Sequence, residues 1–329
     1  MRLRHDPAWL ARASRPDEFG RVAVLLGGDS SERAISLLTG HAVLEALRRR
    51  GVDAEEFDPS ERALQELQER RITRAWIALH GPGGEDGTVQ GALEYLGVPY
   101  TGSGVMGSAI GLDKLRTKRL AKAIGVMTPE AVPLTGPRDF ELAIERLGLP
   151  LIVKPASQGS SIGMTKVERA EDLPGAHAAA RALDASVFAE SWVGGGEYAV
   201  ALLEGEALPS VRIETPRAFC DYEAKYLRED TRCLCPSGLS AAAERHLGSL
   251  ALAAFEAAGA EGWGRADFMM DRAGRPLLIE LNTVPGMTGR SLLPMAARAA
   301  GIDFEALVWR VLETSFVRRP AVAGRGGSR

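Results

Sequence analysis

The chain has 329 residues, of which 45% are hydrophobic and 25% are charged, and its formal net charge is −3. This balance is typical of a soluble globular enzyme, and the length predicts two or three domains rather than a single core. The small net charge gives no support to a nucleic-acid or membrane partner.

The sequence also predicts a cytoplasmic location. Residues 1–20 are basic and polar and lack the apolar stretch of a signal peptide, and no run of about 18 apolar residues could span a membrane. The three cysteines, Cys220, Cys233 and Cys235, are odd in number and form no CxxC pair. We therefore expect free thiols rather than a disulfide framework or a zinc site.

The first hundred residues alternate between strand and helix patterns. We expect strands at 21–27, 53–58 and 75–80, and helices at 31–50, 60–70 and 88–96, the first of them capped by Ser30 or Ser31. This order predicts an open parallel sheet over residues 20–102. It would form an α/β domain of residues 1–102, with residues 1–20 extended.

The pattern changes in residues 103–192, which we expect to form a central α+β domain. A helix at 113–124 comes first, and a strand at 149–155, a Gly- and Ser-rich loop and a return strand at 163–168 follow. These segments predict an antiparallel hairpin with a long tip. A helix at 170–183 and a strand at 186–192 complete the domain.

Residues 193–319 are predicted to form a second α+β domain, and residues 320–329 a flexible tail. Strands are expected at 198–203, 210–214, 264–270 and 276–281, and helices at 239–259, 291–300 and 304–313. The segment 215–238 has no clear period and predicts a long loop that closes over a site.

Two triplets at the last strand pair carry the strongest chemical signal. In Arg265-Ala-Asp267 and Glu280-Leu-Asn282 the outer side chains of each triplet face one side of a strand, and the turn between the strands brings the triplets together. Carboxylate and amide oxygens suit magnesium. The alternative is a buried arginine–carboxylate network without a metal.

Several loops of small residues suggest anion binding. Lys154 precedes a Gly- and Ser-rich loop whose N–H groups could contact phosphates, although a flexible hairpin tip explains it equally well. The glycines after residues 26 and 80 follow predicted strands, where ligands bind in open α/β sheets. The loop 285–291 could form an oxyanion hole, or a plain turn before a helix capped by Ser291.

Seven segments together resemble the D-alanine–D-alanine ligases of the ATP-grasp superfamily: LLGGDSSER, ALHGPGGEDG, PYTGSGVMGSAIGLDK, IVKPASQGSSIGM, DYEAKY, GWGRADFMM and ELNTVPGMTGRS. The resemblance covers residues 22–313. It implies an ATP-grasp fold, of α/β and α+β class, with a parallel-sheet N-terminal domain and two further α+β domains. It also implies a homodimer.

The resemblance implies a role for each matching residue. The residues implied to bind ATP are Lys114, Lys154, Ser161, Glu190, Trp192, Val193, Glu197 and Lys225. Two magnesium ions, or manganese in their place, would be held by Asp267, Glu280 and Asn282. The catalytic residues would be Glu32, Ser160, Tyr226, Arg265, Gly286 and Ser291, with His80 and Leu292 against the substrates.

The implied reaction joins two D-alanine molecules for peptidoglycan precursor synthesis. The first carboxylate would take the γ-phosphate of ATP, and the amine of the second D-alanine would attack the acyl-phosphate and release phosphate. A D-alanine–D-lactate ligase is the nearest alternative, disfavoured by Tyr226. A binding module without activity is disfavoured by the intact Arg265, Asp267, Glu280 and Asn282.

Overall fold

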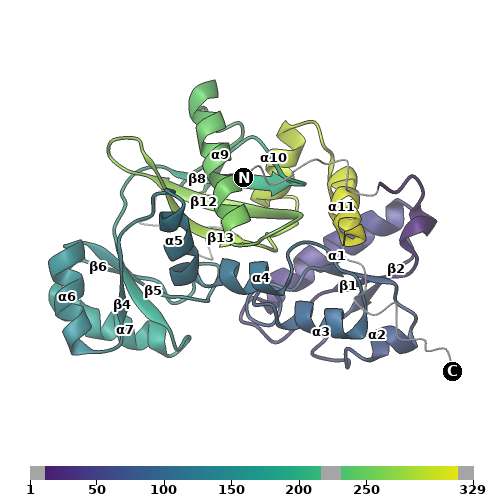
Figure 1. The fold of residues 1–329 in the computed structure, drawn as a ribbon, viewed down its shortest axis with the longest axis horizontal. Coiled ribbons are helices and arrows are strands. Elements are labelled where there is room, and N and C mark those ends of the chain that lie inside the picture. The colour runs from purple at the N-terminus through teal and green to yellow at the C-terminus, as the bar shows by residue number, and fades with distance from the viewer. Residues whose placement is uncertain (1–11, 216–230, 318–329) are drawn as a thin grey trace.

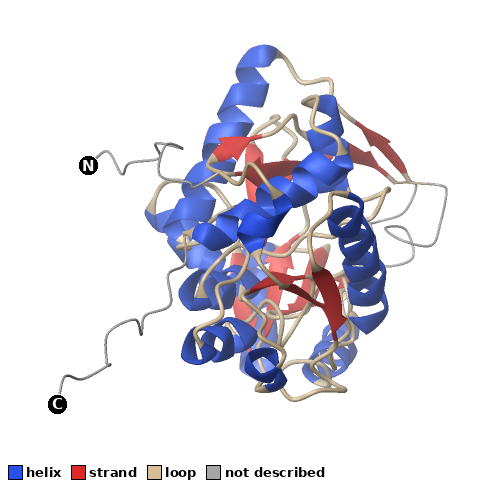
Figure 2. Cartoon of the chain, turned by 90° about the vertical axis from the view of Figure 1, so that its right-hand side faces the viewer, coloured by secondary structure: helices blue, strands red, loops and turns tan. Residues whose placement is uncertain are grey.

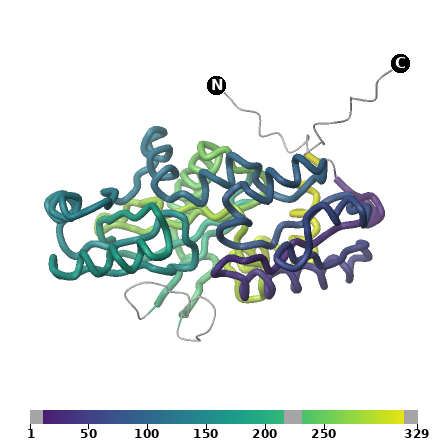
Figure 3. Tube along the Cα trace, turned by 90° about the horizontal axis from the view of Figure 1, so that it is seen from below, coloured from purple at the N-terminus to yellow at the C-terminus, as the bar shows by residue number. Residues whose placement is uncertain are grey.

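The computed structural model describes residues 12–215 and 231–317 of the chain. Its three sheets lie in a row along the long axis of the molecule, with the N-terminal sheet at one end and the central sheet at the other (Figures 1 and 3). Helices pack around the sheets, which lie inside (Figure 2). The expected combination of α/β and α+β parts is confirmed.

The N-terminal sheet is parallel, as predicted, with the order β2-β1-β3. Its strands are β1 (Val22–Leu25), β2 (Ala54–Phe57) and β3 (Arg74–Ile77), and its helices are α1 (Arg33–Arg49), α2 (Glu66–Glu69) and α3 (Thr88–Leu96).

Three local expectations for this region are wrong. Neither Ser30 nor Ser31 caps α1, because Glu32 holds the N-cap position and the Ser30 hydroxyl donates to the carbonyl of His80 at 2.7 Å. The helix expected at 60–70 shrinks to α2, since Ser60 bonds to the Asp58 carboxylate and forms a turn there. Residues 16–19, expected to be extended, form the 3-10 turn η2 (Pro16–Phe19).

The central sheet is antiparallel, with the order β4-β7-β5-β6. It contains β4 (Ala131–Leu134), β5 (Leu151–Pro155), β6 (Thr165–Val167) and β7 (Val187–Ser191), covered by α6 (Pro137–Leu147), η3 (Ala170–Asp172) and α7 (Leu173–Arg181). The predicted hairpin is therefore the pair β5–β6. Strand β4 was not predicted from the sequence, and its Pro133 is tolerated because the strand lies at the sheet edge.

The third sheet is antiparallel and has the order β11-β10-β8-β12-β13, with β9 paired to β8. Its strands are β8 (Glu197–Leu203), β9 (Glu206–Ala207), β10 (Val211–Glu214), β11 (Arg232–Leu234), β12 (Trp263–Met270) and β13 (Pro276–Asn282). Residues 232–234, expected to be loop, thus pair with β10. The rest of that predicted loop, 216–230, lies outside the described residues.

Helices cover both faces of the third sheet. They are α4 (Val105–Leu112), α5 (Lys114–Ala123), α9 (Ala241–Ala257), α10 (Leu292–Ala299) and α11 (Phe304–Glu313), followed by η4 (Thr314–Phe316). Helix α5 packs against β13 and α9, although residue 103 was predicted to begin the central domain. The three predicted domain boundaries therefore stay predictions.

Two of the hydrophobic cores meet the third sheet. One core runs from the N-terminal sheet through Trp76 and Trp263, whose rings lie 5.1 Å apart, to α10 and α11. A second core lies between the other face of the third sheet and helices α5 and α9. The central sheet has its own smaller core with α6 and α7.

Candidate active site

The two acidic triplets meet as predicted on β12 and β13. The strand register places Asp267 opposite Glu280 and Arg265 opposite Asn282. The Arg265 guanidinium donates two hydrogen bonds to the buried Asp267 carboxylate, at 2.7 and 2.8 Å. Two carboxylates thus face each other across the strand pair, with an arginine beside them.

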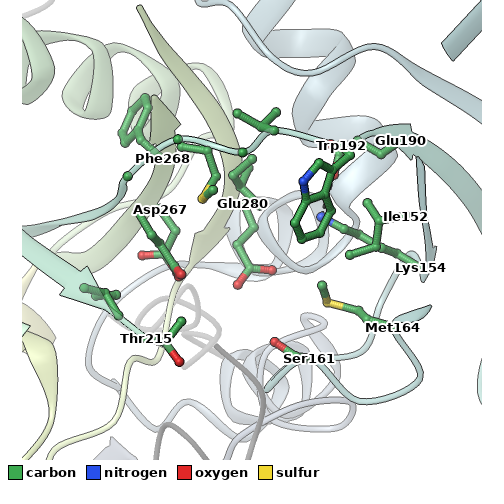
Figure 4. A pocket seen from close by; sticks show the side chains of 18 of the residues that line it. Ile152, Lys154, Ser161, Met164, Glu190, Trp192, Thr215, Asp267, Phe268 and Glu280 are labelled. Atoms are coloured by element: carbon green, nitrogen blue, oxygen red, sulfur yellow. Dashed lines mark hydrogen bonds and ion pairs between the residues drawn. The ribbon is translucent and has the colours of Figure 1, made fainter. Parts of the chain in front are cut away.

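A cavity of about 630 Å³ lies between this hairpin and the central sheet. Asp267 and Glu280 lie on one side of it, and Lys154, Ser161 and Trp192 lie on the other (Figure 4). Every described residue predicted to bind ATP lines this cavity: Lys114, Lys154, Ser161, Glu190, Trp192, Val193, Glu197. Lys225 lies outside the described residues.

The apolar part of the cavity wall was not predicted from the sequence. Ile152, Met164, Phe268 and Ile279 supply it from both sheets. Strand alternation places Ile152 on the same face as Lys154, and this is the signal that could have found it. Phe268 and Ile279 adjoin Asp267 and Glu280 at the point where the β12–β13 register shifts, which the sequence pattern does not show. The cavity therefore combines an apolar slot with charged groups at its edge.

Lys114 joins the Gly- and Ser-rich loop to the acidic pair. Its Nζ donates to the carbonyl oxygen of Gln158 at 2.7 Å and lies 3.1 Å from Glu280 Oε2. Asp113 caps α5 by accepting a hydrogen bond from the Arg116 amide, which fixes the helix start and hence Lys114. An ammonium group thus stands where the cavity meets the loop.

A second, narrower cavity of about 30 Å³ adjoins the first at Lys114 and Glu280. The predicted residues that line it are Glu32, His80, Ser160, Arg265, Asn282 and Gly286. Ser160 donates a hydrogen bond to Glu32, so the loop is tied to the N-terminal domain. A Cβ on Gly159 would lie 2.5 Å from Glu32 Oε2, so a larger residue there would require the Glu32 side chain to move.

Two predicted residues are not brought to these cavities in the described part of the chain. Ser291 precedes α10, and its hydroxyl bonds to the amide and hydroxyl of Thr288 instead of capping the helix. Leu292 packs against the N-terminal core. Tyr226 lies outside the described residues.

Glu85 also lines the second cavity, although no role was predicted for it from the sequence. Its carboxylate accepts hydrogen bonds from the amides of Gly81 and Val284, at 3.1 and 3.2 Å. Burial, helped by the nearby Glu32 carboxylate, raises the pKa of Glu85 to about 8. Burial lowers the pKa of His80 to about 4, so this imidazole is neutral at pH 7.

These two shifts predict a decrease in stability above pH 6.5. Between about pH 6.5 and 8 the folded chain keeps a proton on Glu85 that the unfolded chain releases, so the free energy of unfolding decreases as pH rises. Below pH 6.5 the titration of His80 in the unfolded chain opposes this slope. Urea unfolding measured at pH 6.5 and at pH 8 tests this. The free energy of unfolding should decrease between these two pH values by about 1–2 kcal/mol more in the wild type than in Glu85→Gln. Equal losses in the two proteins would contradict a protonated Glu85.

Gly195 lies in the cavity wall at a position that has no space for a side chain. A Cβ there would lie 1.8 Å from the carbonyl oxygen of Met270, at the end of β12. We expect Gly195→Ala to lower the free energy of unfolding by about 1–3 kcal/mol, because backbone must move. Gly194→Ala is the control, since its Cβ would meet the Trp192 ring at an ordinary 3.6 Å. Thermal unfolding of both variants tests this; equal stability would contradict the close contact.

Comparison with known proteins agrees with this geometry. Residues 51–103 match the family model described as D-ala D-ala ligase N-terminus, and residues 120–313 match D-ala D-ala ligase C-terminus. The D-alanine–D-alanine ligase of Alkalilimnicola ehrlichii is 59% identical over 93% of this chain and 97% of its own length.

Solved structures agree as well. A crystal structure of the D-alanine–D-alanine ligase from Bacillus anthracis is similar with a TM-score of 0.80 and 35% identity, covering 90% of this chain and 97% of that one. The same ligase complexed with ATP gives a TM-score of 0.79 and 32% identity over the same shares. The chain therefore belongs to the D-alanine–D-alanine ligase family, which is built on the ATP-grasp fold.

Proposed function

We propose that this chain joins two molecules of D-alanine into D-alanyl-D-alanine, with ATP converted to ADP and phosphate, for peptidoglycan precursor synthesis. One observation carries the proposal: the large cavity, with its lysines and paired carboxylates, adjoins a small polar cavity at Lys114 and Glu280. A nucleotide in the first cavity would place its terminal phosphate beside an amino acid in the second. The relative solved with ATP supports the identity of the nucleotide.

The chemistry needs an activated carboxylate, because oxide is a poor leaving group. A carboxylate oxygen of the first D-alanine attacks the γ-phosphorus, and ADP leaves. The amine of the second D-alanine then attacks the carbonyl carbon of the D-alanyl phosphate, loses a proton, and phosphate leaves. Lys114 and Lys154 offset the negative charge of the phosphates during the first step.

The residues of the second cavity would bind the first D-alanine and stabilise its reacting carbonyl group. Arg265 and the Gly286 amide are the donors for the tetrahedral oxyanion, an effect typically of about 3–4 kcal/mol for one donor. Glu32 would hold the ammonium of the first D-alanine, and neutral His80 would lie beside it. The small volume of this cavity supports exclusion of water, which would otherwise hydrolyse the acyl-phosphate.

The acidic pair fits divalent cations. Like charges that face each other across a strand pair are destabilising, and here Arg265 pairs with Asp267 and Lys114 pairs with Glu280. With Asn282, the set offers the hard oxygen donors that magnesium prefers. Two magnesium ions, or manganese, would neutralise phosphate charge there when bound.

The remaining roles are proposed from the family pattern. Ser161, Trp192, Val193 and Glu197 would hold the nucleotide with Lys225, and Glu190 would accept from its adenine. Ser291 and Leu292 would meet the second D-alanine, and Tyr226 would complete a hydrogen-bonded set with Glu32 and Ser160. The bond between Ser160 and Glu32 supports the last of these roles.

Phosphate release with a panel of D-amino and D-hydroxy acids tests the function. Release with ATP, magnesium and D-alanine, together with dipeptide as the product, is the expected result. A depsipeptide as the main product with D-lactate at pH 7 would replace this proposal by a D-alanine–D-lactate ligase. The absence of phosphate release with every acid in the panel would favour a protein that binds ligands without catalysing the reaction.

We further propose that the chain acts as a homodimer in the cytoplasm. The two described cysteines, Cys233 and Cys235, are free thiols, which supports a location in a reducing compartment. The proposed use of ATP agrees with the same location. No helix among the described residues is long and apolar enough to cross a membrane. Sedimentation velocity would test the dimer.

A further inference from the structure

Lys118 has a buried charge that the proposed function does not use. It lies one turn after Lys114 on α5, so both ammonium groups leave the same face of the helix. Its side chain is 3% exposed and forms an ion pair with Glu190 of β7. Its Nζ also donates to the carbonyl oxygen of Leu278 on β13, at 3.4 Å. One ammonium group thus joins a helix to strands of two different sheets.

Glu190 has a second cationic partner. Lys154 of β5 lies 2.5 Å from its other carboxylate oxygen. Burial raises the pKa of Glu190, but the two ammonium groups outweigh burial and the net shift is downward. The cluster is therefore an ionised carboxylate between two lysines, and its excess positive charge favours an anion.

The two lysines differ in their access to the cavity. Lys154 and Glu190 line it, whereas Lys118 pairs with Glu190 but is not one of the described residues that line the cavity. Lys154 can therefore turn toward an incoming phosphate, and Lys118 cannot. Once Lys154 has turned, Glu190 would be a buried, unpaired carboxylate without Lys118, and such a group is strongly unfavourable.

We propose that Lys118 is a positioning residue for the nucleotide, which holds the Glu190 carboxylate in place while Lys154 exchanges that carboxylate for a phosphate. The exchange frees one Glu190 oxygen at the cavity surface. That oxygen can accept a hydrogen bond from an amino group such as that of adenine. Phosphate binding and base recognition are thereby coupled through one carboxylate, and this rests on the proposed nucleotide site.

Steady-state kinetics of Lys118→Met test the proposal. We expect the KM for ATP to rise about tenfold or more, because the uncompensated Glu190 charge opposes the departure of Lys154. The KM for D-alanine and kcat at saturating ATP should change less than about threefold. Lys118→Arg, which keeps the charge, should recover most of the affinity for ATP. Lys122→Met is the matched control, an exposed lysine on the same helix, and should match the wild type.

The outcomes separate the two proposals. An unchanged KM for ATP in Lys118→Met, with a raised KM in Lys154→Met, overturns the role of Lys118 alone. An unchanged KM for ATP in both Lys118→Met and Lys154→Met overturns the proposed nucleotide site itself. Equal changes in both KM values and kcat, without recovery in Lys118→Arg, would mark a purely structural lysine and also overturn the inference. If Lys118→Met does not fold, Lys118→Gln, which can keep the bond to Leu278, replaces it.

Discussion

Glu280→Ala is expected to lower phosphate release by about 10³-fold or more while the protein stays folded. Glu280 faces Asp267 across the strand pair and borders both cavities, so its loss removes negative charge at the point where phosphate, lysine and carboxylates meet. The fold should persist, because Lys114 keeps its hydrogen bond to the Gln158 carbonyl. A coupled assay of phosphate, with circular dichroism on the same sample, measures both effects.

The control for this variant is Glu206→Ala. Glu206 is an exposed carboxylate on β9, in the same sheet but away from both cavities. Its removal should leave phosphate release unchanged. Wild-type turnover in Glu280→Ala would contradict the assignment of the acidic pair to cation and phosphate binding.

Arg265→Lys is expected to uncouple the two steps of the reaction. The arginine binds both oxygens of Asp267 and lines the small cavity, where we place the tetrahedral oxyanion. Lysine keeps one positive charge but cannot keep the paired geometry. We expect dipeptide formation to decrease about 10²–10³-fold. Phosphate release should decrease less, since acyl-phosphate still forms and is lost to water.

The ratio of dipeptide to phosphate is the measurement that distinguishes this role. A ratio of one with unchanged kcat would contradict the placement of Arg265 at the oxyanion. Arg265→Met is a useful second variant. It leaves the buried Asp267 without its partner, so its free energy of unfolding should decrease by about 3–5 kcal/mol, much more than in Arg265→Lys.

The sequence predicted the local patterns that repeat with a fixed period. The alternation in Arg265-Ala-Asp267 and Glu280-Leu-Asn282 was enough to place both triplets on one face, and the observed register agrees. The parallel N-terminal sheet followed in the same way from its strand and helix order. Each of these signals is a pattern that repeats along contiguous stretches of the chain.

Features that depend on distant contacts were missed. Helix α4 and strand β4 were not predicted, because glycine or proline breaks their patterns and packing against other elements stabilises them. Ser30 and Ser31 have the composition of helix caps, yet they bond to residues 50 and 127 positions away. Lys118 was overlooked for the same reason, since its partners on β7 and β13 are brought to it only by the fold.

The division of the hydrophobic cores bears on how the molecule moves. The N-terminal sheet and one face of the third sheet share a continuous core, whereas the central sheet has a core of its own. Relative motion that preserves each core is therefore easiest between the central sheet and the rest of the molecule. The large cavity lies across that seam, so rotation of the central sheet would widen or narrow the nucleotide site without breaking either core.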